Sequence, residues 1–114
     1  MSLLASRING GAKVRGVSVV GNRLREARER IGISQKQLGI KAGLDPSVAS
    51  HRINQYETGK HVPDIQTARR LADVLAVPAP YLYAEDDTLA AWILAYTQAS
   101  PTMRKKITRT VTGD

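Results

Sequence analysis

Residues 33–60 constrain the fold of this chain more than any other stretch, because they hold two consecutive helix signals that each end at a glycine. In the first signal, Ser34 stands where a helix N-cap is expected, and Gln37 three positions later completes a capping-box pattern. The pattern predicts a helix over residues 35–42. Gly43 is expected to stop this helix, since glycine readily adopts the left-handed conformation that ends many helices.

The second signal begins after that glycine and predicts another helix. Asp45 is expected to cap it, and Pro46 takes the first helical position, where its missing N–H costs nothing. The helix is expected to run to about Glu57, with Gly59 as its stop. Two short capped helices joined by a tight glycine turn are therefore expected at the centre of the chain.

The rest of the chain adds helices but no strand pattern. Asn22 is a plausible N-cap for a helix that Gly32 ends, and the apolar residues between them recur at helical spacing. The fold class is therefore predicted to be all-α. Helices are predicted over residues 23–31, from residues 63–64 as far as Pro78, as a short turn at residues 80–83, from Asp86 or Asp87 through Tyr96, and over residues 102–111.

Charge is unevenly distributed along the 114 residues, which suffice for one domain. The formal net charge is +7. Residues 1–62 hold eleven Lys and Arg against four Asp and Glu, whereas residues 63–114 hold six of each. A basic half beside a balanced half indicates a surface that binds a polyanion such as a nucleic acid. The alternative is a soluble protein that is basic without binding one.

Several functional classes find no support in the sequence. The chain has no cysteine, and its two histidines, His51 and His61, lie outside any acidic cluster, so neither a disulfide nor a metal site is indicated. No cofactor motif, phosphate-binding loop or nucleophile motif is present, so we do not expect an enzyme. No apolar run approaches the roughly 20 residues of a membrane helix, and a cytoplasmic protein with no membrane partner is expected.

One apolar stripe stands apart from the central helix pair. It consists of Leu89, Trp92, Ile93 and Tyr96, which share one helix face. We expect this face to pack against the helix that begins near residue 64, and an interface between two copies of the chain is the alternative. The basic run at residues 104–106 is expected to be a solvated helix face.

The central helices and their neighbours resemble the phage-repressor family of helix-turn-helix domains (lambda repressor/Cro, or XRE). The resemblance covers residues 21–84 and implies a compact five-helix lambda-repressor-like domain with additional C-terminal helices. Residues 1–20 are then expected to be a flexible basic N-terminal arm, and residues 85–114 a C-terminal helical extension for packing or dimerisation. The residues that carry the resemblance are Leu24, Arg28, Ser34, Gln35, Leu38, Ala42, Gly43, Ile53, Tyr56, Glu57, Gly59, Lys60, Pro63, Asp64, Leu71, Ala72 and Leu75.

The resemblance implies roles for individual residues. Arg28 and Glu57 correspond to a buried ion pair, and Gln35 to a contact with a backbone phosphate. Lys60, with Thr58 and His61, corresponds to a phosphate-binding loop. The residues expected to read bases in the DNA major groove are Ser50, His51, Arg52, Asn54 and Gln55, whose side chains present donors and acceptors.

The chain departs from the family at residues 45–49, which extend the segment before the expected base-reading positions. If they lengthen the third helix, Ser47 enters the groove as well. If they form a longer loop, only the residues from Ser50 onward do.

The expected function is that of a sequence-specific, double-stranded DNA-binding transcriptional regulator. We expect a small repressor that acts as a homodimer on a pseudo-palindromic operator, because half-sites one helical turn apart mirror the symmetry of a dimer. The alternative is a protein-interaction module, such as the antitoxin of a toxin–antitoxin pair or a transcriptional adaptor.

Overall fold

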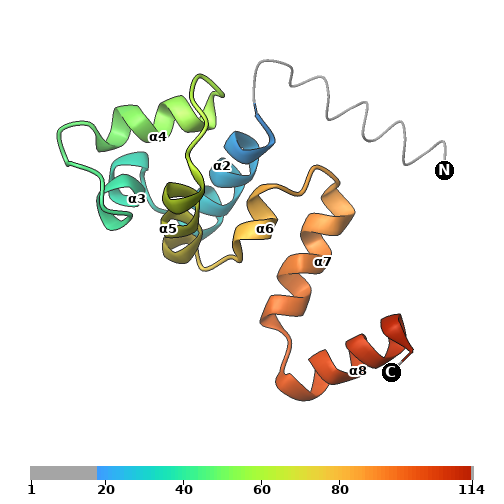
Figure 1. The fold of residues 1–114 in the computed structure, drawn as a ribbon. Coiled ribbons are helices and arrows are strands. Elements are labelled where there is room, and N and C mark those ends of the chain that lie inside the picture. The colour runs from blue at the N-terminus through green and yellow to red at the C-terminus, as the bar shows by residue number, and fades with distance from the viewer. Residues whose placement is uncertain (1–17, 114) are drawn as a thin grey trace.

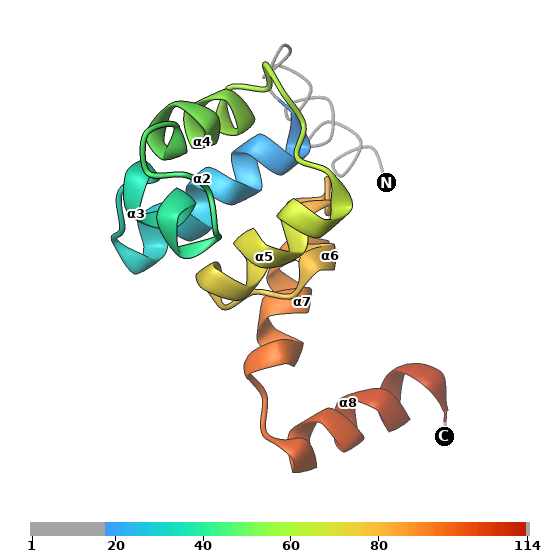
Figure 2. The same cartoon turned by 60° about the vertical axis from the view of Figure 1, so that its left-hand side comes forward.

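The computed structural model describes residues 18–113, and within this range the chain forms seven α-helices and no strand (Figure 1). The predicted all-α fold is confirmed. Figures 1 and 2 both show α2 to α6 gathered into one body, from which α7 leads away to α8. The helices are α2 (Val19–Ile31), α3 (Gln35–Lys41), α4 (Ala49–Glu57), α5 (Ile65–Leu75), α6 (Ala79–Leu82), α7 (Asp87–Gln98) and α8 (Pro101–Thr112).

One hydrophobic core holds the body together. Each of its five helices contributes a fully buried side chain: Leu24, Leu38, Ile53, Leu71 and Tyr81. Such burial is the main favourable term in folding, at about 1.5–3 kcal/mol for each large apolar side chain. By contrast, α7 buries only Ala90, and α8 buries no residue.

The first helix of the body begins earlier than the sequence indicated. Asn22 was expected to cap a helix over residues 23–31, but α2 begins at Val19 with Ser18 as its N-cap. The Ser18 hydroxyl accepts a hydrogen bond from the Gly21 N–H at 2.9 Å. The predicted boundary of the N-terminal arm at residue 20 is therefore wrong, because Val20 lies in the core. The remainder of that arm, residues 1–17, lies outside the described residues.

Gly21 lies in the first turn of α2 and is required for the early start of this helix. A glycine near a helix end looks like a breaker, yet here it lets two helices approach closely. A Cβ atom at this position would lie 2.5 Å from the Tyr56 carbonyl oxygen and 2.7 Å from that of Glu57. The first turn of α2 thus packs directly on the end of α4, and only glycine leaves room for that contact.

The third predicted helix also begins elsewhere, and the expected roles of Asp45 and Pro46 are wrong. Residues 46–48 form a turn, and α4 begins at Ala49. The Asp45 carboxylate accepts the backbone N–H of Ser47 at 2.8 Å and the Ser47 hydroxyl at 2.6 Å. Asp45 therefore closes a local Asx turn in place of a helix cap. These two hydrogen bonds, that from the hydroxyl first, lower the pKa of Asp45.

The starts of α5, α7 and α8 agree with prediction, because a side chain caps each of these helices. The Asp64 carboxylate accepts the Thr67 N–H at 2.7 Å, which lowers the pKa of Asp64 and begins α5. Asp86 caps α7 through the N–H groups of its first turn, and Ser100 caps α8 with Pro101 in the first position.

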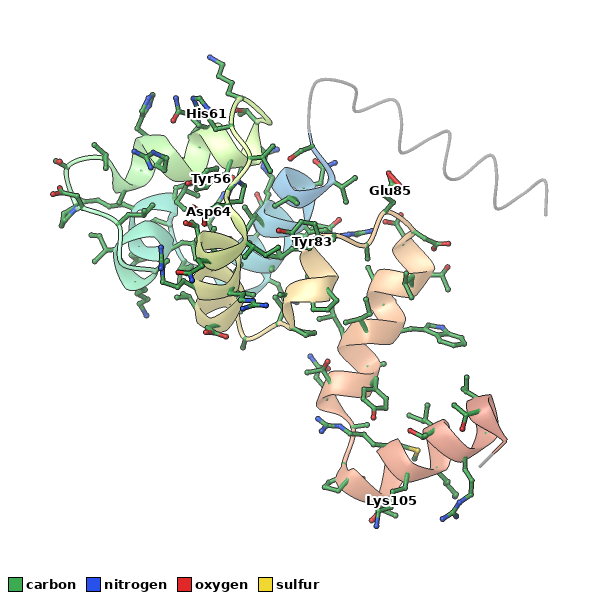
Figure 3. The ribbon with its side chains drawn as sticks, in the orientation of Figure 1. Tyr56, His61, Asp64, Tyr83, Glu85 and Lys105 are labelled. Carbon is green, nitrogen blue, oxygen red and sulfur yellow. The ribbon has the colours of Figure 1, made fainter. Side chains whose placement is uncertain are left out.

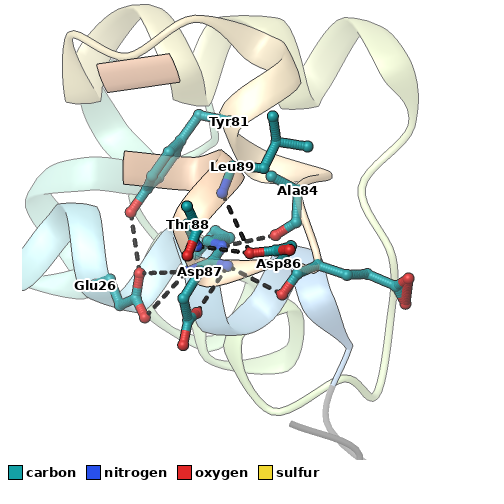
Figure 4. A network of polar contacts seen from close by, with 9 residues as sticks. Glu26, Tyr81, Ala84, Asp86, Asp87, Thr88 and Leu89 are labelled. Atoms are coloured by element: carbon teal, nitrogen blue, oxygen red, sulfur yellow. Dashed lines mark hydrogen bonds and ion pairs between the residues drawn. The ribbon is translucent and has the colours of Figure 1, made fainter. Parts of the chain in front are cut away.

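Arg23 binds the start of α7 to the body, and Figure 4 shows the surrounding polar network with Glu26, Ala84 and Asp87. Its guanidinium is buried and donates to the Ala84 carbonyl at 2.8 Å and to Glu26 and Asp87 at 3.0 Å each. The Tyr81 hydroxyl donates to the same Glu26 carboxylate at 3.0 Å. Burial disfavours the charged guanidinium, but the hydrogen bonds to the two carboxylates outweigh it and raise the pKa of Arg23.

The apolar stripe on α7 does not pack into the core as expected. Ile93 is half-buried against the core, but the side chains of Leu89, Trp92 and Tyr96 point outward and are 52%, 63% and 43% exposed. The helix has no charged residue after Asp87, so it is apolar on more than one side. Periodicity therefore could not indicate which side faces the core. None of the helices in residues 18–113 has the length and apolar character to cross a membrane.

Candidate nucleic-acid interface

The two central helices, α3 and α4, are held at an unusually short separation. Gly39 of α3 faces Ala49 of α4, and a Cβ atom on Gly39 would lie 2.7 Å from the Ala49 Cβ. Beneath this contact, Leu38 and Ile53 are completely buried. The backbone of α3 therefore rests against the first turn of α4 and fixes the position of that helix.

Two features fix the connection between α3 and α4: the backbone conformation of Gly43 and a hydrogen bond from Arg70 on α5. Gly43 has a φ of 95°, the left-handed conformation that glycine adopts without steric cost. The Arg70 guanidinium on α5 donates from Nε to the Ala42 carbonyl oxygen at 3.1 Å. That oxygen lies at the C-terminal end of α3, where a cation is favoured by the helix dipole.

A buried carboxylate joins three helices at the end of α4. The Glu57 side chain is 0% exposed. It accepts from Arg28 Nε at 2.6 Å and Arg28 Nη2 at 3.1 Å, so the ion pair that the resemblance implied is present in the structure. Hydrogen bonding to Glu57 is the main cause that raises the pKa of Arg28. Arg25 lies 3.6 Å away and remains half-exposed.

Gln35 extends this cluster toward the surface of α4. Its amide nitrogen Nε2 donates to Glu57 Oε1 at 3.1 Å and to Asn54 Oδ1 at 3.2 Å. Both hydrogens of the Gln35 amide are thus bonded to side chains of α4. The bond also orients the Asn54 side chain, because its oxygen faces α3 and its amide nitrogen is left to donate elsewhere.

The outer face of α4 is polar. Ala49, Ile53 and Tyr56 point into the body, which leaves the intervening positions outward. The predicted base-reading side chains are thereby brought together on one helix: Ser50, His51, Arg52 and Asn54 are exposed, and Gln55 is half-buried.

Ser47 stands apart from this set. It lies in the turn before α4, and its backbone N–H and hydroxyl both donate to Asp45. The alternative in which residues 45–49 lengthen the third helix is wrong. The expectation that Ser47 enters the groove depended on that longer helix.

The loop after α4 presents two further polar side chains. The backbone N–H groups of Lys60 and His61 both donate to the Gln55 carbonyl oxygen, at 2.9 and 3.2 Å. Both side chains are exposed, and Figure 3 shows His61 beside the end of α4. The positive charge of Lys60 is thus held near the C-terminal end of the polar helix.

Sequence reasoning missed three residues that position this surface: Gly21, Gly39 and Arg70. A lone glycine inside a helical pattern is a signal of close packing, and it could have identified Gly39. No comparable signal marks Arg70, because its contact with residue 42 depends on the packing of α5. Among residues 18–113 no three acidic or histidine side chains come together to hold a metal ion.

The arrangement defines a helix-turn-helix fold: two short helices at a tight glycine turn, with the second presenting a polar outer face. Residues 19–82 match the helix-turn-helix domain family, and the chain belongs to this family.

The chain is also similar to two transcriptional regulators. The HTH-type transcriptional regulator ImmR of Bacillus subtilis (strain 168) is 29% identical over 68 residues, which span 60% of this chain and 50% of ImmR. The chain thus matches about half the length of that relative. The crystal structure of the transcriptional regulator BswR is 46% identical with a TM-score of 0.77, covering 82% of this chain and 93% of that chain.

Proposed function

We propose that this protein is a transcriptional regulator that binds double-stranded DNA through α4 in the major groove. The observation that carries the proposal is the fixed polar face of α4. A major groove about 12 Å wide admits one helix, and its base edges present donor and acceptor patterns that Arg, Asn and Gln side chains match. Membership of the helix-turn-helix domain family and similarity to two regulators support the same conclusion.

The candidate contacts divide into two kinds. Arg52, Asn54 and Gln55 are proposed to read bases, with Ser50 and His51 beside them. Lys60 is proposed to bind a backbone phosphate, a contact that adds affinity without sequence preference. Gln35 is proposed to act indirectly, because its amide hydrogens hold Asn54 and Glu57 and are not free for a phosphate.

The protein is further proposed to act as a homodimeric repressor on a pseudo-palindromic operator. A bound dimer would exclude other proteins from a promoter by occupying it. Two copies related by a two-fold axis place two α4 helices on half-sites about 34–36 Å apart.

Selection of bound sequences from random DNA duplexes tests the proposal. The wild-type protein is expected to select a pseudo-palindrome, whereas Arg52→Ala and Gln55→Ala should each relax one position of each half-site. Loss of one good base contact corresponds to about 1–3 kcal/mol of discrimination. An unchanged consensus in both variants would contradict the role of α4.

Lys60→Ala separates the two kinds of contact. It is expected to weaken binding to all sequences evenly and to reduce the slope of log affinity against log salt by about 1. Lys41→Ala is the matched control, because this exposed lysine lies in the last turn of α3 and is not among the proposed DNA contacts. Equal effects of the two substitutions would contradict a phosphate contact by Lys60.

A further inference from the structure

A cleft lies where α7 and α8 meet. Its volume is about 380 Å³, within the range of about 300–1,000 Å³ that is usual for small-molecule sites. Both helices contribute to its lining, which consists of Tyr96, Arg104, Lys105, Thr108 and Arg109. Three of these five side chains are cationic, one is aromatic and one carries a hydroxyl group.

Arg104 holds the two walls of this cleft together. Its Nε donates to the Tyr96 carbonyl oxygen at 3.0 Å, and its Nη2 donates to the Thr97 carbonyl oxygen. Both carbonyl groups belong to the last turn of α7, where the helix dipole favours a cation. The guanidinium carbon also lies 5.5 Å from the centre of the Tyr96 ring, a distance typical of a cation–π contact. Arg104 therefore keeps the Tyr96 ring beside α8.

The other two cations of the cleft have no counter-charge. The side chains of Lys105 and Arg109 are exposed, and neither forms a hydrogen bond or ion pair with another residue of the described range 18–113. They are four residues apart on one helix, so they share a face and repel each other. Residues 88–113 carry four basic side chains and no acidic one. An anion between Lys105 and Arg109 would remove this repulsion.

The lining indicates the chemistry of a ligand. Arg and Lys side chains both bind phosphate oxygens, and Arg does so with two parallel hydrogen bonds. The Thr108 hydroxyl belongs to the same lining and can donate a further hydrogen bond. The Tyr96 side chain is 43% exposed and offers its ring to a planar group. A phosphate group joined to an aromatic base, as in a nucleotide, matches both parts of the lining.

The position of the cleft distinguishes such a ligand from the DNA backbone. Figures 1 and 2 both show α8 at the far end of the molecule from α4, and Figure 3 shows Lys105 on that distant helix. A duplex against the outer face of α4 is therefore not expected to reach the cleft. A small molecule suits the site better than the DNA that α4 is proposed to bind.

We propose that the cleft between α7 and α8 binds a small phosphorylated ligand of the nucleotide class. Lys105 and Arg109 bind its phosphate groups, and Tyr96 stacks against its base. The ligand contacts residues of both helices and so fixes the position of α8 against α7. The site goes beyond the proposed function, because it lies outside the surface proposed for DNA and does not depend on DNA binding.

Titration of the isotope-labelled full-length protein with ADP, followed by nuclear magnetic resonance, tests the proposal. Amide signals from the end of α7 and from α8 should shift and saturate at ADP concentrations that leave the signals of α4 unchanged. Adenosine has the same base but no phosphate, and it should bind at least about tenfold more weakly because the charge-assisted hydrogen bonds are lost. Tyr96→Leu should weaken the binding of ADP and leave that of pyrophosphate, which has no base, unchanged.

Two neighbouring lysines separate a defined site from general attraction by charge. Lys105→Ala should weaken ADP binding about fivefold, as expected for loss of one phosphate contact at an exposed site. Lys106→Ala is the matched control, because it removes the same charge from the same helix but Lys106 does not line the cleft. The control should change ADP binding less than about twofold. Both substitutions are compatible with helix, since alanine has the highest helix propensity.

Three results would overturn the proposal. They are the absence of saturable shifts at the cleft, equal effects of Lys105→Ala and Lys106→Ala, and equal affinity for ADP and adenosine. Shifts of the same cleft signals by a DNA duplex of random sequence would assign the site to nucleic acid and also contradict the proposal. Failure of the protein to select a DNA consensus would count against the proposed function alone, so the two proposals can fail separately.

Discussion

The body and the C-terminal extension use their apolar residues in opposite ways. In the body, large side chains such as Leu24, Ile53 and Tyr81 are completely enclosed, and a buried ion pair and close glycine contacts fix the helices. In the extension, Leu89, Trp92 and Tyr96 are exposed to solvent, and α8 has no buried residue. The body encloses its large apolar side chains, whereas the extension leaves several of its own exposed to solvent.

The largest expected effect on stability belongs to Glu57→Gln in the body. The substitution leaves the Arg28 guanidinium without its carboxylate in a buried setting, and loss of one partner from such a pair costs about 3–5 kcal/mol. Urea unfolding followed by circular dichroism measures this loss. Glu29→Gln, which changes an exposed carboxylate on α2, should stay within about 0.5 kcal/mol of wild type. Similar losses in both variants would show that the ion pair does not hold the body together.

A smaller loss is expected for Gly39→Val, which acts on the separation of α3 and α4. The added side chain meets Ala49, and overpacking of this kind costs about 1–3 kcal/mol. Ile40→Val on the same helix is the control, because that side chain is partly exposed and retains its β-branch. If Gly39→Val unfolds at the same urea concentration as the control, the short helix separation is not required.

The smallest effect is expected for Trp92→Ala in the extension. At protein concentrations where the chain is a monomer, the change in unfolding free energy should be within about 0.5 kcal/mol, because the side chain is exposed there. At high concentration the variant should be less stable than wild type, since association stabilises the folded state by mass action. Equal losses at all concentrations would mean that Trp92 packs within its own chain.

The sequence predicted the start of a helix correctly where the polar residue before it had no competing local partner. Ser34 and Asp64 precede clear apolar stripes, and both are caps in the structure. Asp45 belongs to the same residue class but closes a turn with Ser47. Whether Asp45 caps a helix or closes a turn depends on where α4 packs against α3. The local sequence pattern does not contain that information.

At the candidate interface, too, some features could be predicted from the sequence and others depend on tertiary packing. Ile53 and Tyr56 are buried, and the polar residues expected to read bases lie between and beside them on the outer face of α4. The pairing of Arg28 with Glu57 was accessible only through the family resemblance. The inward orientation of Gln35 could not be predicted, because its two partners belong to α4 and their distances exist only after folding.

The contacts of Glu57 with Arg28 and Gln35 divide the polar residues on the outer face of α4 into two groups. The groups differ in how far substitution should affect stability. Asn54 is linked through Gln35 to the carboxylate that joins three helices, so we expect a substitution there to change stability as well as the proposed DNA recognition. Ser50, His51 and Arg52 are exposed and make no side-chain hydrogen bond within residues 18–113. Under the proposed role of α4, new DNA preferences should therefore arise, in evolution or by design, through these three positions while stability is preserved.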